Sequence, residues 1–238
     1  MRPAASTAIP SSRVEKEGND EIYERIYVAI LEHRLTPGSK LPEEKMAKVF
    51  NVSRSRIREV LSRLAYEKVV ELVTNRGAYI AKPTVIQARD VFEARRVIEP
   101  AIMERLVRNS DPEAISSLRK HVELEGEARQ RNDARAVIRL SGEFHNLCAI
   151  HAGNAAFTRS MRELSSQTCL IILLYDAALS ESCRADEHSL IVDALERGDG
   201  AAASQLMLEH LDHIQSSLDL TDRLNTEVDI DAIFGSGN

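Results

Sequence analysis

The chain has 238 residues, enough for one large domain or two ordinary ones, and 43% of them are apolar, as in a typical globular protein. Trp is absent and only 4% of residues are aromatic, so the core must be mainly aliphatic, and the low Gly and Pro content favours helices. No apolar run has the length of a membrane span, and the N-terminus has no signal-peptide core. The three cysteines are odd in number, which favours reduced thiols. Together these features indicate a cytoplasmic protein.

The net charge of −6 is unevenly distributed along the chain. Residues 1–83 have a net charge of +4, whereas the remainder has −10. A basic N-terminal part joined to an acidic C-terminal part suggests that only the first part meets a polyanion.

The first part begins with an irregular segment and two expected helices. Residues 1–18 lack periodicity, and we expect a disordered arm there. Apolar residues then recur at helical spacing over about 19–33 and 43–50. The segment 35–42 between them contains Pro-Gly and is expected to be a turn.

A third helix, strongly basic, is expected to begin after Ser53, whose hydroxyl suits an N-cap. Cations near a helix N-terminus oppose the helix dipole, so a helix built only for stability would place them elsewhere. A helix whose N-terminal end enters the major groove of DNA would place them there, because Arg binds guanine and phosphate. A solvated basic face is the alternative interpretation. The basic residues are Arg54, Arg56, Arg58 and Arg63, and the apolar stripe is Ile57, Val60, Leu61 and Leu64.

After residue 67 the pattern changes from helical to extended. The β-favouring runs 69–73 and 78–81 flank a hairpin turn in which Asn75 and Gly77 can take positive φ. This predicts a two-stranded wing with Arg76 at its tip, where it could reach phosphate or the minor groove.

These motifs resemble the winged helix-turn-helix of GntR-family bacterial transcription regulators over about residues 20–82. The resemblance rests on Pro37-Gly38 with Leu41-Pro42, Val52-Ser53-Arg54, Arg58-Glu59-Val60-Leu61 and Asn75-Arg76-Gly77-Ala78-Tyr79-Ile80. Two positions depart from the family pattern: Glu44 replaces a frequent basic residue and Arg56 a frequent proline. From the resemblance and the basic pattern we expect DNA contacts from Ser53, Arg54, Ser55, Arg56, Arg58, Arg76 and Gly77.

From Val85 onward the pattern is helical almost throughout. The sequence therefore predicts a mainly α protein, in which a winged helix-turn-helix domain (19–83) precedes an all-α helical bundle (86–222). We expect no regular structure in the tail, 223–238. The expected helices of the bundle lie near 86–108, 111–130, 133–151, 155–180, 183–197 and 200–222.

Three histidines of the bundle are candidate metal ligands. His188 and His210 each lie eleven positions from Asp199, in the turn between two helices that should pack antiparallel, so they should sit at the same height. His145, on an earlier helix, could be the third ligand. Three neutral imidazoles suit Zn²⁺ or Ni²⁺. The alternative is three unrelated histidines. The other four, His33, His121, His151 and His213, are expected to be solvated or capping residues.

The bundle resembles the effector domain of the FadR subfamily, the FCD domain, over about residues 86–215. The resemblance rests on Arg95 with Glu99, Glu143-Phe144-His145, Gly153-Asn154, Glu187-His188, Gly198-Asp199 and His210. It implies a divalent metal among three His and one Asp, with small carboxylates bound at or beside it.

Ser141 occupies the position where that family has the Asp ligand. Because Ser is a weak and neutral ligand, a metal here would keep an open position. We hypothesise that an organic-acid effector supplies the missing oxygen, with Arg95 as its charge partner. The competing hypothesis is that no metal binds and the histidines contact the effector directly. The expected effector-binding residues are Arg95, Ser141, His145, His188 and His210.

The function that follows is ligand-controlled DNA binding by a homodimer on a roughly palindromic operator, without enzymatic activity and without a membrane partner. A metal-dependent hydrolase with a three-histidine site is the first alternative. Its nearest general base, Glu143, lies two residues before His145 and should point to a different side of the helix. The second alternative is a helical dimerisation protein with a degenerate wing, against which the arginines of the third helix argue.

Overall fold

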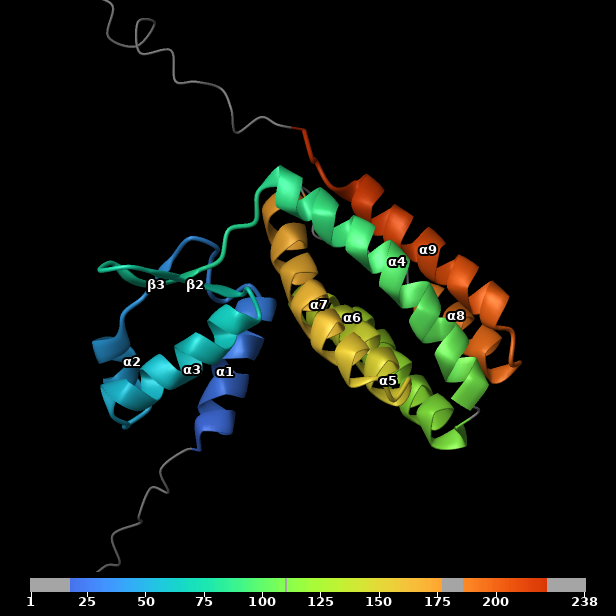
Figure 1. The fold of residues 1–238 in the computed structure, drawn as a ribbon, viewed down its shortest axis with the longest axis horizontal. Coiled ribbons are helices and arrows are strands. Elements are labelled where there is room, and N and C mark those ends of the chain that lie inside the picture. Colours follow the sequence, from blue (N-terminus) through green and yellow to red (C-terminus); the bar gives the residue numbers. More distant parts are fainter. Residues whose placement is uncertain (1–17, 110, 177–185, 222–238) are drawn as a thin grey trace, which may run out of the picture.

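The computed structural model describes residues 18–109, 111–176 and 186–221. They form two domains, visible as the left and right halves of Figure 1. The N-terminal domain contains α1 (Asn19–Leu31), β1 (Lys40–Leu41), α2 (Glu43–Val49), α3 (Arg54–Tyr66), β2 (Val70–Val73) and β3 (Gly77–Ile80). The helical domain contains α4 (Val85–Asn109), α5 (Pro112–Gln130), α6 (Ala134–His151), α7 (Ala155–Tyr175), α8 (Glu187–Glu196) and α9 (Gly200–Ser217).

The N-terminal domain is a helix-turn-helix followed by a small antiparallel sheet. Ser53 caps α3 by accepting a hydrogen bond from the backbone N–H of Arg56, as its position predicted. The apolar stripe of α3 is fully buried against α1, α2 and β2. That burial fixes which side of α3 faces the core, so the side with Arg54 and Arg58 faces solvent.

The sheet has three strands in the order β1-β3-β2, one more than the sequence predicted. Lys40 and Leu41 lie in the segment expected to be a turn, and they pair with Tyr79 and Ala78 of β3. Gly38, with φ of +79°, turns the chain and donates its N–H to the carbonyl of Ile80. A strand of two residues is too short to show an alternating sequence pattern, so its extended conformation depends on pairing with β3.

The helical domain contains the expected helices, but two of them end earlier than predicted. Helix α7 stops at Tyr175 and α9 at Ser217, not near 180 and 222. The backbone N–H of Asp219 donates to the carbonyl of Tyr175, so a tertiary contact ties the two helix ends together. Helix α8 begins at Glu187, and the earlier start expected near 183 falls on residues outside the described range.

Side-chain caps and one close approach define the helical packing. Asp111, Asp133, Asn154 and Asp199 each accept backbone N–H bonds at the start of a helix. A Cβ atom added to Gly142 on α6 would lie 2.9 Å from Sγ of Cys169 on α7, so the small residue allows these helices to pack closely. Within the described ranges, no helix is long and apolar enough to span a membrane.

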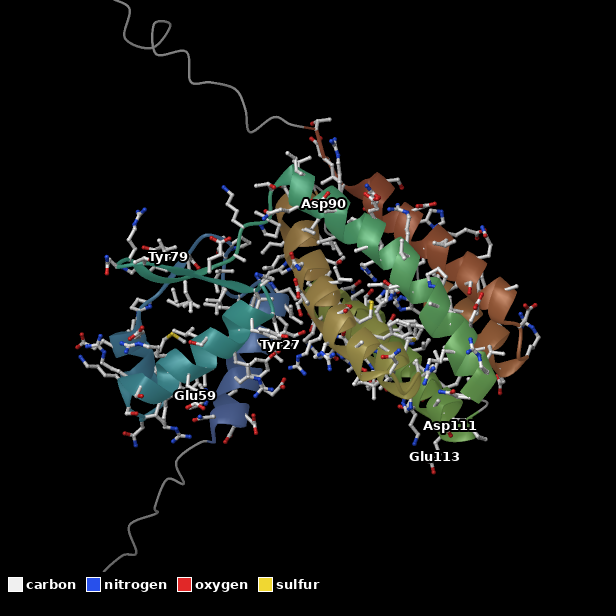
Figure 2. The ribbon with its side chains drawn as sticks, in the orientation of Figure 1. Tyr27, Glu59, Tyr79, Asp90, Asp111 and Glu113 are labelled. Carbon is white, nitrogen blue, oxygen red and sulfur yellow. The ribbon has the colours of Figure 1, made fainter. Side chains whose placement is uncertain are left out.

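The two domains meet where α1 packs against α6 and α7. Tyr27 of α1 hydrogen-bonds Ser166 of α7 at 2.7 Å, and Figure 2 places Tyr27 at this junction. A ring nitrogen of His33 donates to the carbonyl of Cys169, which corrects its expected role as a solvated or capping residue. Similarly, His121 joins α5 to α6 through the carbonyl of Leu140. Both rings are partly buried because tertiary packing covers them.

Candidate functional site

Three histidines from three helices converge inside the helical domain. His145 of α6, His188 of α8 and His210 of α9 are all buried. The Nε2 atom of His210 lies 3.2 Å from Nε2 of His188 and 3.2 Å from Nε2 of His145. The short turn at Gly198 places α8 beside α9, which is why residues eleven positions on either side of Asp199 face each other.

Each of these imidazoles is held from behind by a carboxylate. Glu99 of α4 lies 2.6 Å from Nδ1 of His145, and both carboxylate oxygens of Glu125 on α5 lie 2.9 Å from Nδ1 of His188. Glu187 lies 2.7 Å from Nδ1 of His210. Burial would raise the pKa of these glutamates, but their cationic and histidine partners outweigh it and lower the pKa of each.

This arrangement determines where the ring protons lie. An ionised carboxylate beside Nδ1 requires an N–H there, which leaves each neutral ring with a lone pair on Nε2. Burial lowers the pKa of His145 to about 3 and that of His210 to about 4, so both rings are neutral near neutral pH. The Nε2 lone pairs of His145 and His210 therefore point into the cluster, where Nε2 of His188 also lies.

The donor set fits a divalent transition metal. Nitrogen ligands about 2.0–2.1 Å from a tetrahedral Zn²⁺ are about 3.3 Å apart. The two Nε2–Nε2 distances that involve His210, 3.2 Å each, agree with that spacing. The carboxylate behind each ring is the usual second partner of a metal-binding imidazole, because it fixes the tautomer and makes Nε2 more basic.

A buried arginine adjoins the cluster of histidines. The Nε atom of Arg95 donates to Glu99 at 2.5 Å, and its Nη1 donates to Oγ1 of Thr168 on α7 at 3.0 Å. Its side chain is only 1% exposed, yet Nη2 has no hydrogen-bond partner among the described residues. An unsatisfied buried guanidinium N–H is costly, so an anionic oxygen in its vicinity would be stabilised.

Three other residues of α6 have varied surroundings. Ser141 is buried on α6, four residues before His145 and therefore on the same face. Glu143 forms an ion pair with Arg139 at 2.8 Å, outside the histidine cluster. Cys148 is buried, which raises the pKa of its thiol and makes it unreactive.

Sequence reasoning missed two of the partners that hold the cluster. The resemblance included Glu99 and Glu187, but Glu125 and Thr168 were not identified. Glu125 lies on α5, away from the three histidines in sequence, and Thr168 lies on α7, which contains no histidine. Only the packing of α5 and α7 beside the cluster brings them to it, so no local pattern marks them.

The residues expected to contact DNA lie in the N-terminal domain. On α3, Arg54 and Arg58 are exposed beside Glu43 of α2, and Ser55 is also exposed. Arg56 is different, because its Nε donates to Oδ1 of Asn19 and its side chain therefore lies toward α1. The hydroxyl of Ser53 is engaged as the N-cap.

The β2–β3 hairpin places Arg76 and Gly77 at its turn, where both are exposed. Asn75 has φ of +60° and Gly77 of +99°, the conformation that the sequence predicted for this turn. On the neighbouring strand β1, the amino group of Lys40 lies 5.8 Å from the ring centre of Tyr79 and adds a cation beside the wing.

Comparison with protein families gives two matches. Residues 19–80 match the model of the bacterial regulatory proteins of the gntR family, and residues 90–213, more than half of the chain, match that of the FCD domain. The two matched ranges coincide with the two domains of the structure.

Relatives of known name are transcription regulators. The chain is 25% identical to the HTH-type transcriptional repressor RspR of Escherichia coli K12, over 84% of this chain and 88% of that protein. It is 26% identical to the gluconate operon transcriptional repressor of Bacillus licheniformis, over 80% of each. These relatives give no support to the metal-dependent hydrolase.

Solved structures show the same fold. A structure described as a transcriptional regulator GntR from Rhodococcus sp. RHA1 superposes with a TM-score of 0.72 at 24% identity, covering 83% of this chain and 95% of that one. E. coli McbR/YncC gives 0.71 at 16% identity over the same shares of the two chains. The two family matches show that the chain belongs to the GntR family of bacterial transcription regulators, with an N-terminal DNA-binding winged helix-turn-helix and a C-terminal FCD effector domain.

Proposed function

We propose that this regulator binds a roughly palindromic operator as a homodimer in the cytoplasm, and that a small organic acid bound in the FCD domain controls that binding. It has no catalytic role in this proposal. The observation that supports effector sensing is the convergence of three imidazole Nε2 atoms beside a buried arginine with an unsatisfied Nη2. Such a site is costly unless a cation and an anion compensate it.

His145, His188 and His210 would hold the cation, for which Zn²⁺ or Ni²⁺ is the best candidate. The bound metal would supply a Lewis acid with an open coordination position. Since Ser141 contributes no charge, the effector carboxylate would complete the site. Arg95 would orient that carboxylate, and the name of the gluconate operon repressor gives a precedent for a relative linked to an organic acid.

Metal analysis tests this site directly. The purified protein, incubated with Zn²⁺ or Ni²⁺ and desalted, is expected to contain about one ion per chain by elemental mass spectrometry. Ser141→Asp restores a fixed anion four residues before His145, so it should slow metal removal by a chelator. Acetate should slow removal from the wild type but have less effect on Ser141→Asp.

Two results would count against this account, the first against the metal and the second against the role of Ser141. A protein without bound ion after both incubations would favour direct binding of the effector by the histidines and Arg95. Equal chelation rates for the wild type and Ser141→Asp would mean that Ser141 does not line the site.

Helix α7 is the element through which we propose that the effector acts on the DNA-binding domain. It contacts Arg95 through Thr168, and two residues earlier Ser166 contacts Tyr27 of α1. Ser166 donates its proton to the carbonyl of Arg162, so Tyr27 is the donor in the contact between domains. Figure 1 shows α7 on the side of the helical domain that faces α1. A shift of α7 would therefore change both the contact with Arg95 and the contact with Tyr27.

Tyr27→Phe is expected to weaken this coupling, because it removes the donated hydrogen bond while keeping the ring. The measurement is the ratio of operator affinities of Zn²⁺-loaded and metal-free protein, for which allosteric coupling typically gives about 5- to 150-fold. Tyr66→Phe is the matched control, since Tyr66 is exposed on α3. A wild-type ratio preserved in Tyr27→Phe would exclude this route.

A further inference from the structure

The first residue of α2, Glu43, is engaged by two arginines of α3. Its carboxylate accepts from Nε of Arg58 at 3.3 Å and from Nη2 of Arg58 at 2.9 Å, one bond to each oxygen. Nη2 of Arg54 lies 3.8 Å from the same carboxylate. Because Arg54 and Arg58 are four residues apart, they share one face of α3. Hydrogen bonds from Arg58 lower the pKa of Glu43, so the carboxylate is ionised near neutral pH.

The exposures of the three side chains indicate that Glu43 holds the two arginines in place. The side chain of Glu43 is 21% exposed, whereas those of Arg54 and Arg58 are 62% and 63% exposed. Glu43 also lies in the first turn of α2, where the helix dipole favours an anion. The carboxylate is thus fixed by its own helix, and the arginines extend past it into solvent.

The two-point contact also determines how Arg58 is presented. The Glu43 carboxylate occupies the edge of the guanidinium formed by Nε and Nη2. The end formed by Nη1 and the second proton of Nη2 stays available to another acceptor. That end matches the paired acceptors O6 and N7 of guanine in the major groove. Within the described ranges Arg58 has no other ionic partner, so nothing competes for this end. A guanidinium already held in place loses less side-chain freedom when it binds.

We infer that Glu43 is a positioning residue that sets sequence specificity by holding Arg58, and more weakly Arg54, for base contacts. This inference rests on the proposed role of those arginines in DNA binding. Glu43 also places a negative charge near the phosphate backbone, which weakens binding to every sequence. Only a duplex whose base edge accepts hydrogen bonds from the Arg58 guanidinium regains the lost binding free energy. Glu43 therefore lowers non-specific affinity and raises the preference for the operator.

Glu44 provides a matched control. It is the next residue of α2, but it pairs with Lys48 at 3.0 Å and does not contact α3 through any described ion pair. Glu43→Ala and Glu44→Ala therefore remove the same charge from nearly the same place. Glu43→Asp keeps the charge but shortens the side chain, which separates the effect of charge from that of geometry.

The experiment measures the affinity of the full-length protein for an operator selected from random duplexes and for a scrambled duplex, at several salt concentrations. Both alanine variants should bind the scrambled duplex somewhat more tightly. Of the two alanine variants, only Glu43→Ala should lower the ratio of operator affinity to scrambled-duplex affinity, by about tenfold. Glu43→Asp should lower that ratio without tightening binding to the scrambled duplex. Thermal unfolding midpoints of all variants establish that they are folded.

Two results would overturn the inference, and they are distinguishable. Equal ratios for Glu43→Ala and Glu44→Ala, with the wild type still preferring the operator, would leave only a general charge effect and refute the role of Glu43 alone. A wild type that selects no sequence would refute the proposed operator binding, and the inference with it.

Discussion

Replacing His210 with alanine is expected to eliminate stoichiometric metal binding. His210 is the central ring, because its Nε2 lies 3.2 Å from Nε2 of each of the other two histidines. The variant would leave two imidazole ligands and no carboxylate ligand. Since loss of a group behind a ligand already weakens metal binding by about 10- to 100-fold, loss of the ligand itself should weaken it by more than about 100-fold.

The measurement is metal content after incubation with Zn²⁺, together with the shift of the unfolding midpoint that Zn²⁺ produces. A ligand that binds only the folded state raises that midpoint, so the shift should be present in the wild type and absent in His210→Ala. His213→Ala is the matched control, because His213 contacts the same Glu187 but is 43% exposed and lies outside the cluster. It should keep the metal.

A second variant protects this test against misfolding, since the ring of His210 is completely buried. Glu125→Gln keeps the size of the side chain and removes only the charge behind His188. It should bind metal about 10- to 100-fold more weakly while remaining folded. Full metal content in both His210→Ala and Glu125→Gln would contradict a metal site at these histidines.

Most of the architecture could be predicted because each helix has its own pattern. The apolar stripe of α3 and its N-cap at Ser53 are local signals, and the structure contains both where the sequence places them. The strand at Lys40 was missed, and the ends of α7 and α9 were predicted too late. In each case a residue distant in sequence decides the local conformation, as when Asp219 binds the carbonyl of Tyr175.

The candidate site divides in the same way. The proximity of His188 and His210 followed from their equal separation from one turn, which is geometry that a sequence contains. The carboxylate of Glu125 and the hydroxyl of Thr168 could not be predicted, because three-dimensional packing alone brings α5 and α7 to the cluster. The orientation of Arg56 toward Asn19 is likewise invisible in the spacing of arginines on α3.

Arg58→Ala is expected to reduce operator affinity by about 1–3 kcal/mol, or roughly 5- to 150-fold, if the arginine contacts a base edge. The expectation rests on its exposed position near the N-terminal end of α3 and on the two-point contact that Glu43 makes with it. The affinity for a scrambled duplex should change much less, because the lost discrimination belongs to one base pair. Competition binding with duplexes altered at single positions would locate that base pair, where the variant should no longer discriminate.

Arg63→Ala provides the control for charge on the same helix. The guanidinium of Arg63 pairs with Asp20 and lies 3.8 Å from the ring centre of Tyr23, so it faces α1 and not the end of α3 that bears Arg54 and Arg58. Its loss should leave sequence discrimination intact, even where it lowers stability.

A uniform loss of affinity for all duplexes in Arg58→Ala, with a salt dependence reduced by about one phosphate contact, would instead assign Arg58 to the DNA backbone. Specificity would then have to come from Ser53, Arg54, Ser55 or the wing, since these are the other exposed candidates on the same domain.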